Sequence, residues 1–225
     1  MRMKWMLAAL IAMGLAVPVG AAAQQGQTNA AQRQAVAAQG QSPWGLFDVG
    51  VSGYENLTSS SRGNGALETP SNSPGGLVEV RDIFKPLVGV ELSYGFNLMN
   101  TTFAPNGTNC GFYCNAPITK LDIKDNNIAG DYVASLKYGK LQPFAVAGVG
   151  FNITSAPASL YGVREVIRAA WNVGGGVDWG LTSHLGIRAQ VRDYLIKAPN
   201  NSSQFPATGV TINNIEPMGG VYYRF

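Results

Sequence analysis

Alternation of apolar with polar or small residues is the feature of this sequence that most constrains its fold. In the segment LGIRAQVRDY, residues 185–194, the odd positions up to 191 are Leu, Ile, Ala and Val, and the even positions up to 192 are Gly, Arg, Gln and Arg. A period of two predicts a β-strand with one apolar face. The segments VGVELSYGF (88–96), IAGDYVASLKY (128–138) and RAAWNVGGGVDW (168–179) repeat the pattern. We therefore expect an all-β fold.

The alternation and the turn residues between its segments predict eight strands. Most of these strands are close in length to the roughly 9 to 11 residues that a tilted strand needs to cross a bilayer. In the fifth strand both faces are apolar or small, so its lipid-facing side is left unassigned. The predicted strands cover residues 45–57, 76–84, 87–98, 127–138, 143–153, 167–180, 185–197 and 213–225.

Short and long connections alternate between these strands. Tight connections fall around 84–86, 139–142 and 181–184, whereas the other four are long, polar and rich in Asn, Ser, Gly and Pro. The long connections cover residues 58–75, 99–126, 154–166 and 198–212. Outer-membrane barrels have short periplasmic turns and long extracellular loops. We therefore predict an eight-stranded antiparallel up-and-down transmembrane β-barrel over residues 44–225, with both of its ends on the periplasmic side.

The N-terminal segment has the composition of a secretory signal peptide. Arg2 and Lys4 precede an apolar run from Trp5 to Val17, and three alanines at 21–23 form a small-residue cleavage site. The run is too short to span a bilayer as a helix, although an uncleaved anchor is the alternative. We expect cleavage after Ala23, followed by a flexible periplasmic leader at 24–43, which is rich in Gln and Ala.

Charge is scarce in this chain. Charged residues make up 13% of the sequence, against about 25% in ordinary soluble domains. Removal of Arg2 and Lys4 with the signal lowers the formal net charge from +3 to +1. That balance argues against a nucleic-acid partner, because nucleic-acid-binding domains are strongly basic. Low charge without long apolar runs is typical of membrane strands, in which only every second residue faces lipid.

The two faces of the strands differ in side-chain size. The polar face carries many glycines and serines beside a few long charged residues, which suits the narrow lumen of an eight-stranded barrel. Large rings, such as Tyr132, Trp171 and Trp179, lie on the apolar face toward strand ends, as in the aromatic girdles of membrane barrels. A soluble barrel with the apolar face inward is the alternative. The predicted polar network of the lumen comprises Glu79, Arg81, Glu91, Asp131, Lys137, Arg168, Asp178, Arg188, Arg192 and Glu216.

The segments LVGVELSYGF, LGIRAQVRDY and GVYYRF resemble the small eight-stranded outer-membrane barrels of the OmpA transmembrane-domain and OmpX type. In that family a final Phe with hydrophobic residues at alternate preceding positions is the mark read by the barrel-assembly machinery. Val221, Tyr223 and Phe225 match this C-terminal assembly signal. The resemblance implies two partners, the outer-membrane lipid and the assembly machinery. Nothing follows Phe225 in this sequence, so the peptidoglycan-binding domain of full-length OmpA is not implied.

The two cysteines, Cys110 and Cys114, lie in the segment TNCGFYC within a predicted long loop. An exported chain meets an oxidising compartment, so a local disulfide is the leading interpretation. A metal site is poorly supported, because two thiols and the single His of the chain do not complete a tetrahedral zinc shell. We expect neither a metal nor a cofactor.

The sequence shows no combination of residues typical of a catalytic site. The leading hypothesis is therefore a non-enzymatic outer-membrane protein of structural or surface-interaction type. The enzymatic barrels of this membrane resemble one another in needing a His near the catalytic set at the outer rim. The only His, His184, falls in a predicted periplasmic turn, which disfavours a hydrolase. Two alternatives remain. One is a small pore or solute channel, and the other is an adhesin that binds an unknown surface ligand through its long loops, with Phe103, Phe112 and Tyr113 beside the cysteines.

Overall fold

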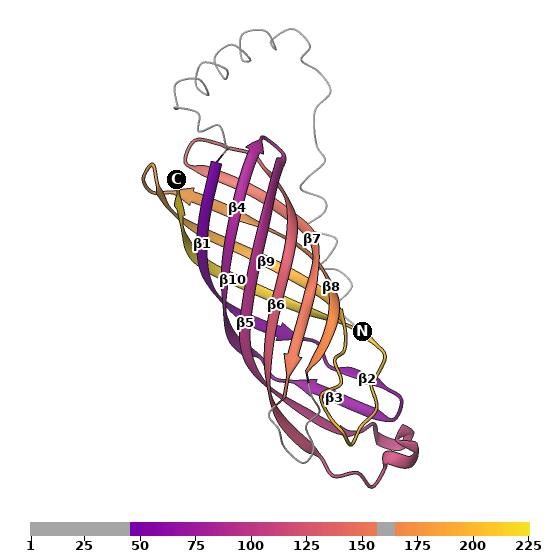
Figure 1. Ribbon diagram of the computed structural model, residues 1–225. Coiled ribbons are helices and arrows are strands. Elements are labelled where there is room, and N and C mark those ends of the chain that lie inside the picture. Colours follow the sequence, from indigo (N-terminus) through magenta and orange to yellow (C-terminus); the bar gives the residue numbers. More distant parts are fainter. Residues whose placement is uncertain (1–45, 157–164) are drawn as a thin grey trace. The chain divides into compact units, whose positions relative to one another are not determined.

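The computed structural model describes residues 46–156 and 165–225. The predicted signal peptide at 1–23 and the leader at 24–43 lie outside the described residues. Eight long strands wind around a common axis and form a closed antiparallel barrel (Figure 1). They are β1 (Leu46–Thr58), β4 (Ser73–Lys85), β5 (Val88–Pro105), β6 (Thr119–Ser135), β7 (Leu141–Ser155), β8 (Val166–Gly180), β9 (Leu185–Lys197) and β10 (Thr211–Arg224).

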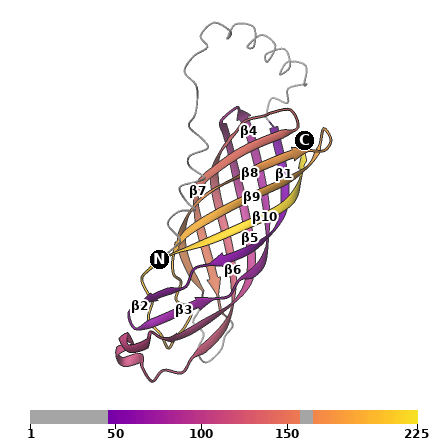
Figure 2. The same ribbon diagram turned by 180° about the vertical axis from the view of Figure 1, so that it is seen from behind.

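Each barrel strand pairs with its neighbours in the sequence of barrel strands, and one further pairing, between β1 and β10, closes the barrel. The first strand, β1, pairs with the last, β10, from Asp48↔Arg224 to Thr58↔Asn214. The pairing of β5 with β6 runs from Gly89↔Val133 to Phe103↔Thr119. Figure 2 shows β10 running between β1 and β9 on the side hidden in Figure 1. Closure leaves none of these eight strands with a free edge, which is what hydrocarbon demands of a spanning sheet.

In the barrel the apolar residues of the alternating pattern face outward, and the polar and small residues face the lumen. In β9, Leu185, Ile187 and Val191 are 49%, 41% and 49% exposed on the outer face. Arg188 and Arg192 from the same strand point inward and have no exposed surface. A soluble barrel would show the opposite arrangement, so the outer face is the one built for lipid.

The outer face also resolves the orientation of β7, which the sequence left open. Its odd residues, such as Val149 and Phe151, are exposed, and its even residues, such as Phe144 and Asn152, are buried in the lumen. Exposed rings gather at both ends of the apolar band. One set lies near the tight turns: Phe47, Phe84, Tyr138, Trp179, Tyr223 and Phe225; the other lies farther toward the long loops: Phe96, Phe151 and Trp171.

The two ends of the barrel differ, and we name them by their connections. The turn end carries the three tight turns and Phe225, and the loop end carries the long connections (Figure 1). At the loop end, the connection predicted at 58–75 contains a hairpin of β2 (Ser61–Gly63) and β3 (Ala66–Pro70). Its turn residues, Asn64 and Gly65, have φ of 50° and 84°, the pair of positive values that a tight Asn-Gly hairpin turn requires.

Strands β5 and β6 are longer than predicted. The sequence ended the third strand at residue 98 and began the fourth at 127, whereas β5 runs to Pro105 and β6 begins at Thr119. Only residues 106–118 connect them, with two 3-10 turns, η1 (Gly107–Asn109) and η2 (Gly111–Tyr113). The prediction of a loop over 99–126 is therefore wrong. No helix in the described part of the chain is long and apolar enough to cross a membrane.

Candidate functional site

The turn-end half of the lumen holds a set of buried ion pairs, named here the charge network. Its members are Asp48, Glu79, Arg81, Glu91, Asp131, Asp178, Arg188, Arg192 and Arg224. Arg188 is central, because its guanidinium reaches three carboxylates from three other strands. Its Nη2 lies 3.0 Å from Asp48 Oδ1, its Nη1 2.6 Å from Glu79 Oε1, and its Nε 2.7 Å from Asp178 Oδ1.

Arg192 and Arg81 extend the charge network across the lumen. The Nη2 of Arg192 lies 2.9 Å from Glu79 Oε2 and 2.5 Å from Glu91 Oε1, and its Nη1 lies 3.2 Å from Asp131 Oδ2. Arg81 donates from Nε and Nη2 to the same oxygen of Glu91, at 2.8 and 2.5 Å. Because most carboxylates here are shared between two arginines, opposite strands are tied together through the centre of the barrel.

Small and aromatic neighbours give these long side chains their positions. A Cβ on Gly50 would lie 2.8 Å from Glu79 Oε1 and 3.3 Å from Arg188 Nη1, so a larger residue there would displace the ion pair. The guanidinium of Arg81 stacks over the ring of Phe144 at 4.1 Å, and that of Arg188 lies 5.0 Å from the ring of Tyr222. Such cation–π contacts hold arginine planes in place where water is excluded.

The structure places the ten predicted lumen residues unequally. Seven belong to the charge network: Glu79, Arg81, Glu91, Asp131, Asp178, Arg188 and Arg192. Glu216 is buried and Arg168 half-buried, and neither makes an ion pair within residues 46–156 and 165–225. Lys137 lies outside the lumen, and its placement there is wrong. Strand β6 ends at Ser135, so the alternation no longer applies at 137 and the lysine is exposed in the turn.

Sequence reasoning missed two members of the charge network. Asp48 shares its inward parity with Gly50 and Ser52 on β1, and Arg224 shares it with Tyr222 on β10. The alternation of inward and outward residues along β1 and β10 could therefore have identified both residues from the sequence. Arg224 reaches Asp48 at 3.4 Å and Gln142 at 3.3 Å, at the turn-end opening of the lumen.

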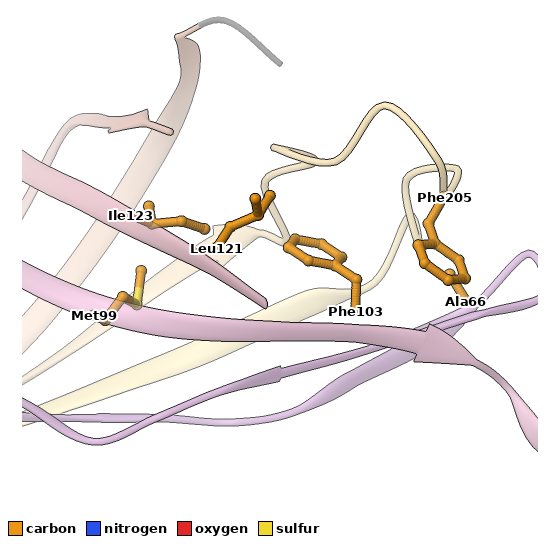
Figure 3. Packing of buried hydrophobic residues seen from close by; sticks show 6 residues of the cluster. All are labelled: Ala66, Met99, Phe103, Leu121, Ile123 and Phe205. Carbon is orange, nitrogen blue, oxygen red and sulfur yellow. The ribbon is translucent and has the colours of Figure 1, made fainter. Parts of the chain in front are cut away.

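A second assembly, named here the head, closes the loop end. It consists of β2 and β3, the outer parts of β5 and β6 with their connection, and a capping loop at residues 198–210. Its apolar core joins β3, β5, β6 and the capping loop, and comprises Ala66, Met99, Phe103, Leu121, Ile123 and Phe205 (Figure 3). Phe205 comes from the capping loop and packs beside Ala66 of β3, so the loop is fixed over the lumen by burial.

Hydrogen bonds fasten the capping loop to three other elements. Asn201 Nδ2 donates to the Thr154 carbonyl at 3.3 Å, and Thr119 Oγ1 donates to Gln204 Oε1 at 2.7 Å. Asn64 Nδ2 of the hairpin turn donates to the Ala207 carbonyl at 2.8 Å. The lumen is therefore covered at the loop end as well as filled at the turn end.

Glu68 is the ionisable group at the centre of the head. Its Oε2 accepts a hydrogen bond from Ser61 Oγ at 3.1 Å, and Ser61 Oγ accepts one from Thr208 Oγ1 of the capping loop at 3.0 Å. The side chain makes no ion pair among the described residues. Burial raises the pKa of Glu68 to about 7, while the Ser61 hydrogen bond acts in the opposite direction.

The predicted disulfide between Cys110 and Cys114 is present in the connection of the head. The three rings beside it have different surroundings. Phe103 is buried in the apolar core, and Tyr113 packs against it and lies 6.3 Å from the Phe205 ring. Phe112 is fully exposed. The disulfide thus holds one large apolar side chain out in solvent.

His184 lies in the exposed turn between β8 and β9, at the turn end. Its Nδ1 is 2.8 Å from the hydroxyl of its neighbour Ser183, and its ring stacks on Tyr223 at 5.8 Å. No carboxylate contacts the imidazole in the part of the chain that the structure describes. The same residues contain no group of three or more His, Cys, Asp or Glu side chains arranged to hold a metal ion.

Comparison with known proteins rests on structure, because no protein-family model and no curated sequence matches the chain. Neisserial surface protein A (NspA) matches with a TM-score of 0.54 and 15% identity, over 80% of this chain and 97% of its own. The fold is that of the small eight-stranded outer-membrane barrels. OprG from Pseudomonas aeruginosa matches with a TM-score of 0.55 and 17% identity, over 80% of this chain and 96% of its own. At these identities the likeness concerns the fold alone.

Proposed function

We propose that this chain is an integral outer-membrane protein without catalytic activity, whose barrel anchors the head at the cell surface. The turn end then faces the periplasm and the loop end faces the exterior, as is general for such barrels. One observation carries the proposal: arginines with no exposed surface fill the lumen, while the apolar residues of the same strands face outward. The lumen of the barrel is thus filled by side chains. A barrel of this kind serves as a membrane anchor, and the head is the part available for interaction.

A solid barrel favours a structural or surface-interaction role over transport. An eight-stranded barrel is just wide enough to be filled by its own side chains. Here the charge network ties opposite walls together and the capping loop covers the loop end. A solute would have to separate several buried ion pairs to pass.

Single-channel recording in planar bilayers tests this closure. We expect no sustained conductance from the refolded protein. A variant lacking residues 199–209 is the matched control, and it should stay silent because the charge network still fills the lumen. Sustained and reproducible open levels from the unaltered protein would replace the anchor with a small solute channel.

Membrane residence has its own test. The boiled and unboiled protein should migrate differently on a denaturing gel, and the protein should be recovered with outer-membrane fractions. N-terminal sequencing of that material should begin near residue 24 if the signal is cleaved after Ala23. Recovery as a β-rich protein of the soluble periplasm would contradict the proposal.

The head is the candidate interaction surface, and Phe112 is its most exposed large apolar side chain. Aromatic residues, Phe among them, are enriched in protein interfaces relative to the rest of the surface. Deleting residues 108–115, or the single change Phe112→Ser, should reduce binding of the producing bacteria to host cells or matrix. Asn115→Ser, an exposed change beside the same disulfide, should not. Equal binding by all variants would remove Phe112 from the proposal.

A further inference from the structure

The layer of the lumen between the charge network and the apolar core of the head contains carboxylates without cationic partners. Asp125 on β6 and Glu216 on β10 are each 1% exposed and point inward. All fully buried arginines of the described chain belong to the charge network below them. Arg192 on β9 is the register partner of Glu216, and its guanidinium is already paired with Glu79, Glu91 and Asp131.

The same layer contains buried amide oxygens that accept no hydrogen bond from any residue the structure describes. They are the Oδ1 atoms of Asn97, Asn152, Asn201 and Asn214. Asp125 Oδ2 and Glu216 Oε1 are likewise without a partner among those residues. The unpartnered donors of this region are fewer: Asn56 Nδ2, the Tyr54 hydroxyl, and Nε of Arg168, the register partner of Asn152. An excess of unpartnered acceptors is unusual, because buried polar groups are generally paired.

Strand register brings most of these oxygens together around Asp125. Asn97 is the β5 register partner of Asp125, and Thr154 is its β7 register partner. Asn152 Nδ2 donates to Asp125 Oδ1 at 2.5 Å and to Asn127 Oδ1 at 2.7 Å, so its amide lies against the carboxylate. Asn201 of the capping loop bonds to the Thr154 carbonyl and so approaches the same level.

Glu216 faces this group from the other side of the lumen. Like Asp125, Glu216 makes no ion pair among the described residues. The Tyr54 hydroxyl of β1 reaches across the lumen toward β5 and β6, because a Cβ on Gly95 would lie 3.4 Å from Tyr54 Oη and 3.8 Å from Asn127 Cβ. Two buried carboxylates without cationic partners need a positive charge or protons to offset their desolvation.

From this arrangement we propose that the upper lumen binds one calcium ion, held by Asp125 and Glu216 and by the amide oxygens of Asn97 and Asn152, under the Asn201 amide. Calcium takes six to eight oxygen ligands, about half of them commonly from neutral carbonyl groups, and tolerates irregular geometry. Protonation of both carboxylates would add two donors, and together with Asn56 Nδ2, Arg168 Nε and the Tyr54 hydroxyl these remain fewer than the six free acceptors. The ion would link β5, β6, β7 and β10 just beneath the capping loop.

Calorimetric titration of the refolded full-length protein with calcium chloride tests the site. The protein is kept in zwitterionic detergent free of lipopolysaccharide, because lipid phosphates bind calcium themselves. We expect one calcium per chain, with a dissociation constant in the range of about 0.1–1 mM that is typical of extracellular sites. Terbium should bind competitively and show luminescence excited through Tyr54.

Asp125→Asn and Glu216→Gln should each weaken calcium binding at least tenfold. Asp122→Asn is the matched control, since Asp122 lies on the same strand with its side chain exposed on the outer face, and its affinity should equal that of the unaltered protein. Asn97→Asp adds a third carboxylate and should tighten binding.

Two results would overturn the proposal. One is the absence of saturable calcium binding by the unaltered protein, which would leave protons and water as the partners of these carboxylates. The other is an Asp125→Asn variant that binds as tightly as the control. If Asp125→Asn does not reach the heat-modifiable folded form, Asn97→Asp decides, and an unchanged affinity in that variant counts against the site. The outcome is independent of the conductance and cell-binding tests above.

Discussion

At the scale of single residues, the lumen shows how an arginine can be stable without contact with water. Burying a charge costs on the order of several kcal/mol unless partners of opposite charge compensate for it. Arg188 meets this condition with three carboxylates and two nearby rings, those of Phe144 and Tyr222. Each of these buried carboxylates in turn needs the positive charge of Arg188 to offset its own desolvation.

Replacing Arg188 with Met should therefore be costly. The change leaves Asp48, Glu79 and Asp178 without this partner, and removing one member of a buried pair destabilises by about 3–5 kcal/mol. Urea unfolding in lipid vesicles measures the loss. Arg224→Gln is the control, since Arg224 is partly exposed and makes a single 3.4 Å pair, and it should lose less than about 1 kcal/mol. A loss below about 1 kcal/mol for Arg188→Met would show that the network does not hold the barrel together.

Glu68 predicts how the head responds to pH. Its pKa is about 7 in the folded head and near 4.5 when exposed, so the folded state keeps the proton over this interval while the open state loses it. Stability therefore falls as pH rises from about 4.5 to about 7, by at most about 3 kcal/mol. Above pH 7 the buried carboxylate is ionised without a cationic partner among the described residues, and the head around it, including the capping loop, is least stable.

Hydrogen exchange of residues 198–210 at pH 5 and pH 8 measures this effect. Exchange should be faster at pH 8 by more than the intrinsic chemical difference. Glu68→Gln keeps the hydrogen-bonding shape without the charge and should abolish the excess. Exchange that follows the intrinsic rate at both pH values in the unaltered protein would contradict the prediction.

At the scale of elements, the strand alternation predicted the barrel but misplaced two strand ends, for a physical reason. Within the membrane the apolar residues of β5, such as Leu92 and Leu98, face outward. Beyond Leu98 the same inward positions carry Met99 and Phe103, while Asn100 faces outward. The alternation reverses its sign where the strand leaves lipid, because the outer face then meets water and the inner face packs the head. A search for one continuous apolar face ends the strand at that point.

The same reasoning explains which site residues could be found from the sequence. Parity within the membrane strands indicated most of the charge network. Glu68 lies in a hairpin that is linked to the capping loop by the Thr208–Ser61 bond, across a separation of 147 residues. Phe205 lies in that loop and packs on residues of β3, β5 and β6. Such contacts depend on how the loops fold over the lumen, which no local pattern encodes.

Reversal of the alternation predicts opposite results for two outward arginine substitutions. Val191→Arg places a charge near the middle of the lipid-facing band of β9 and should destabilise the barrel by about 2–4 kcal/mol. Asn100→Arg lies on the outer face of β5 beyond the reversal, in water, and should change stability by less than about 0.5 kcal/mol. Unfolding of both variants in the same vesicles gives the comparison. Equal losses would place the membrane boundary beyond Asn100.

At the scale of the whole molecule, closure joins strands from the two ends of the barrel sequence. Beyond the β1–β10 ladder, the Phe225 amide donates to the Phe47 carbonyl at 3.0 Å, and the two rings lie 5.5 Å apart. Tyr223 and Phe225 are in edge contact at 4.9 Å. These rings belong to the aromatic set at the turn end, so their effect on stability and their proposed role in assembly must be separated.

A pair of substitutions separates the two roles. Phe225→Ala and Phe84→Ala each remove an exposed ring from the turn end. Each should lower the free energy of unfolding of the refolded barrel by only about 1 kcal/mol, because Phe225 loses aromatic contacts of about that value and Phe84 loses a half-exposed apolar side chain. If Val221, Tyr223 and Phe225 form the signal read by the assembly machinery, Phe225→Ala alone should reduce the heat-modifiable protein in cell envelopes several-fold. Equal reductions in both variants would mean that the rings act only as interfacial anchors, and that the assembly machinery does not read Phe225.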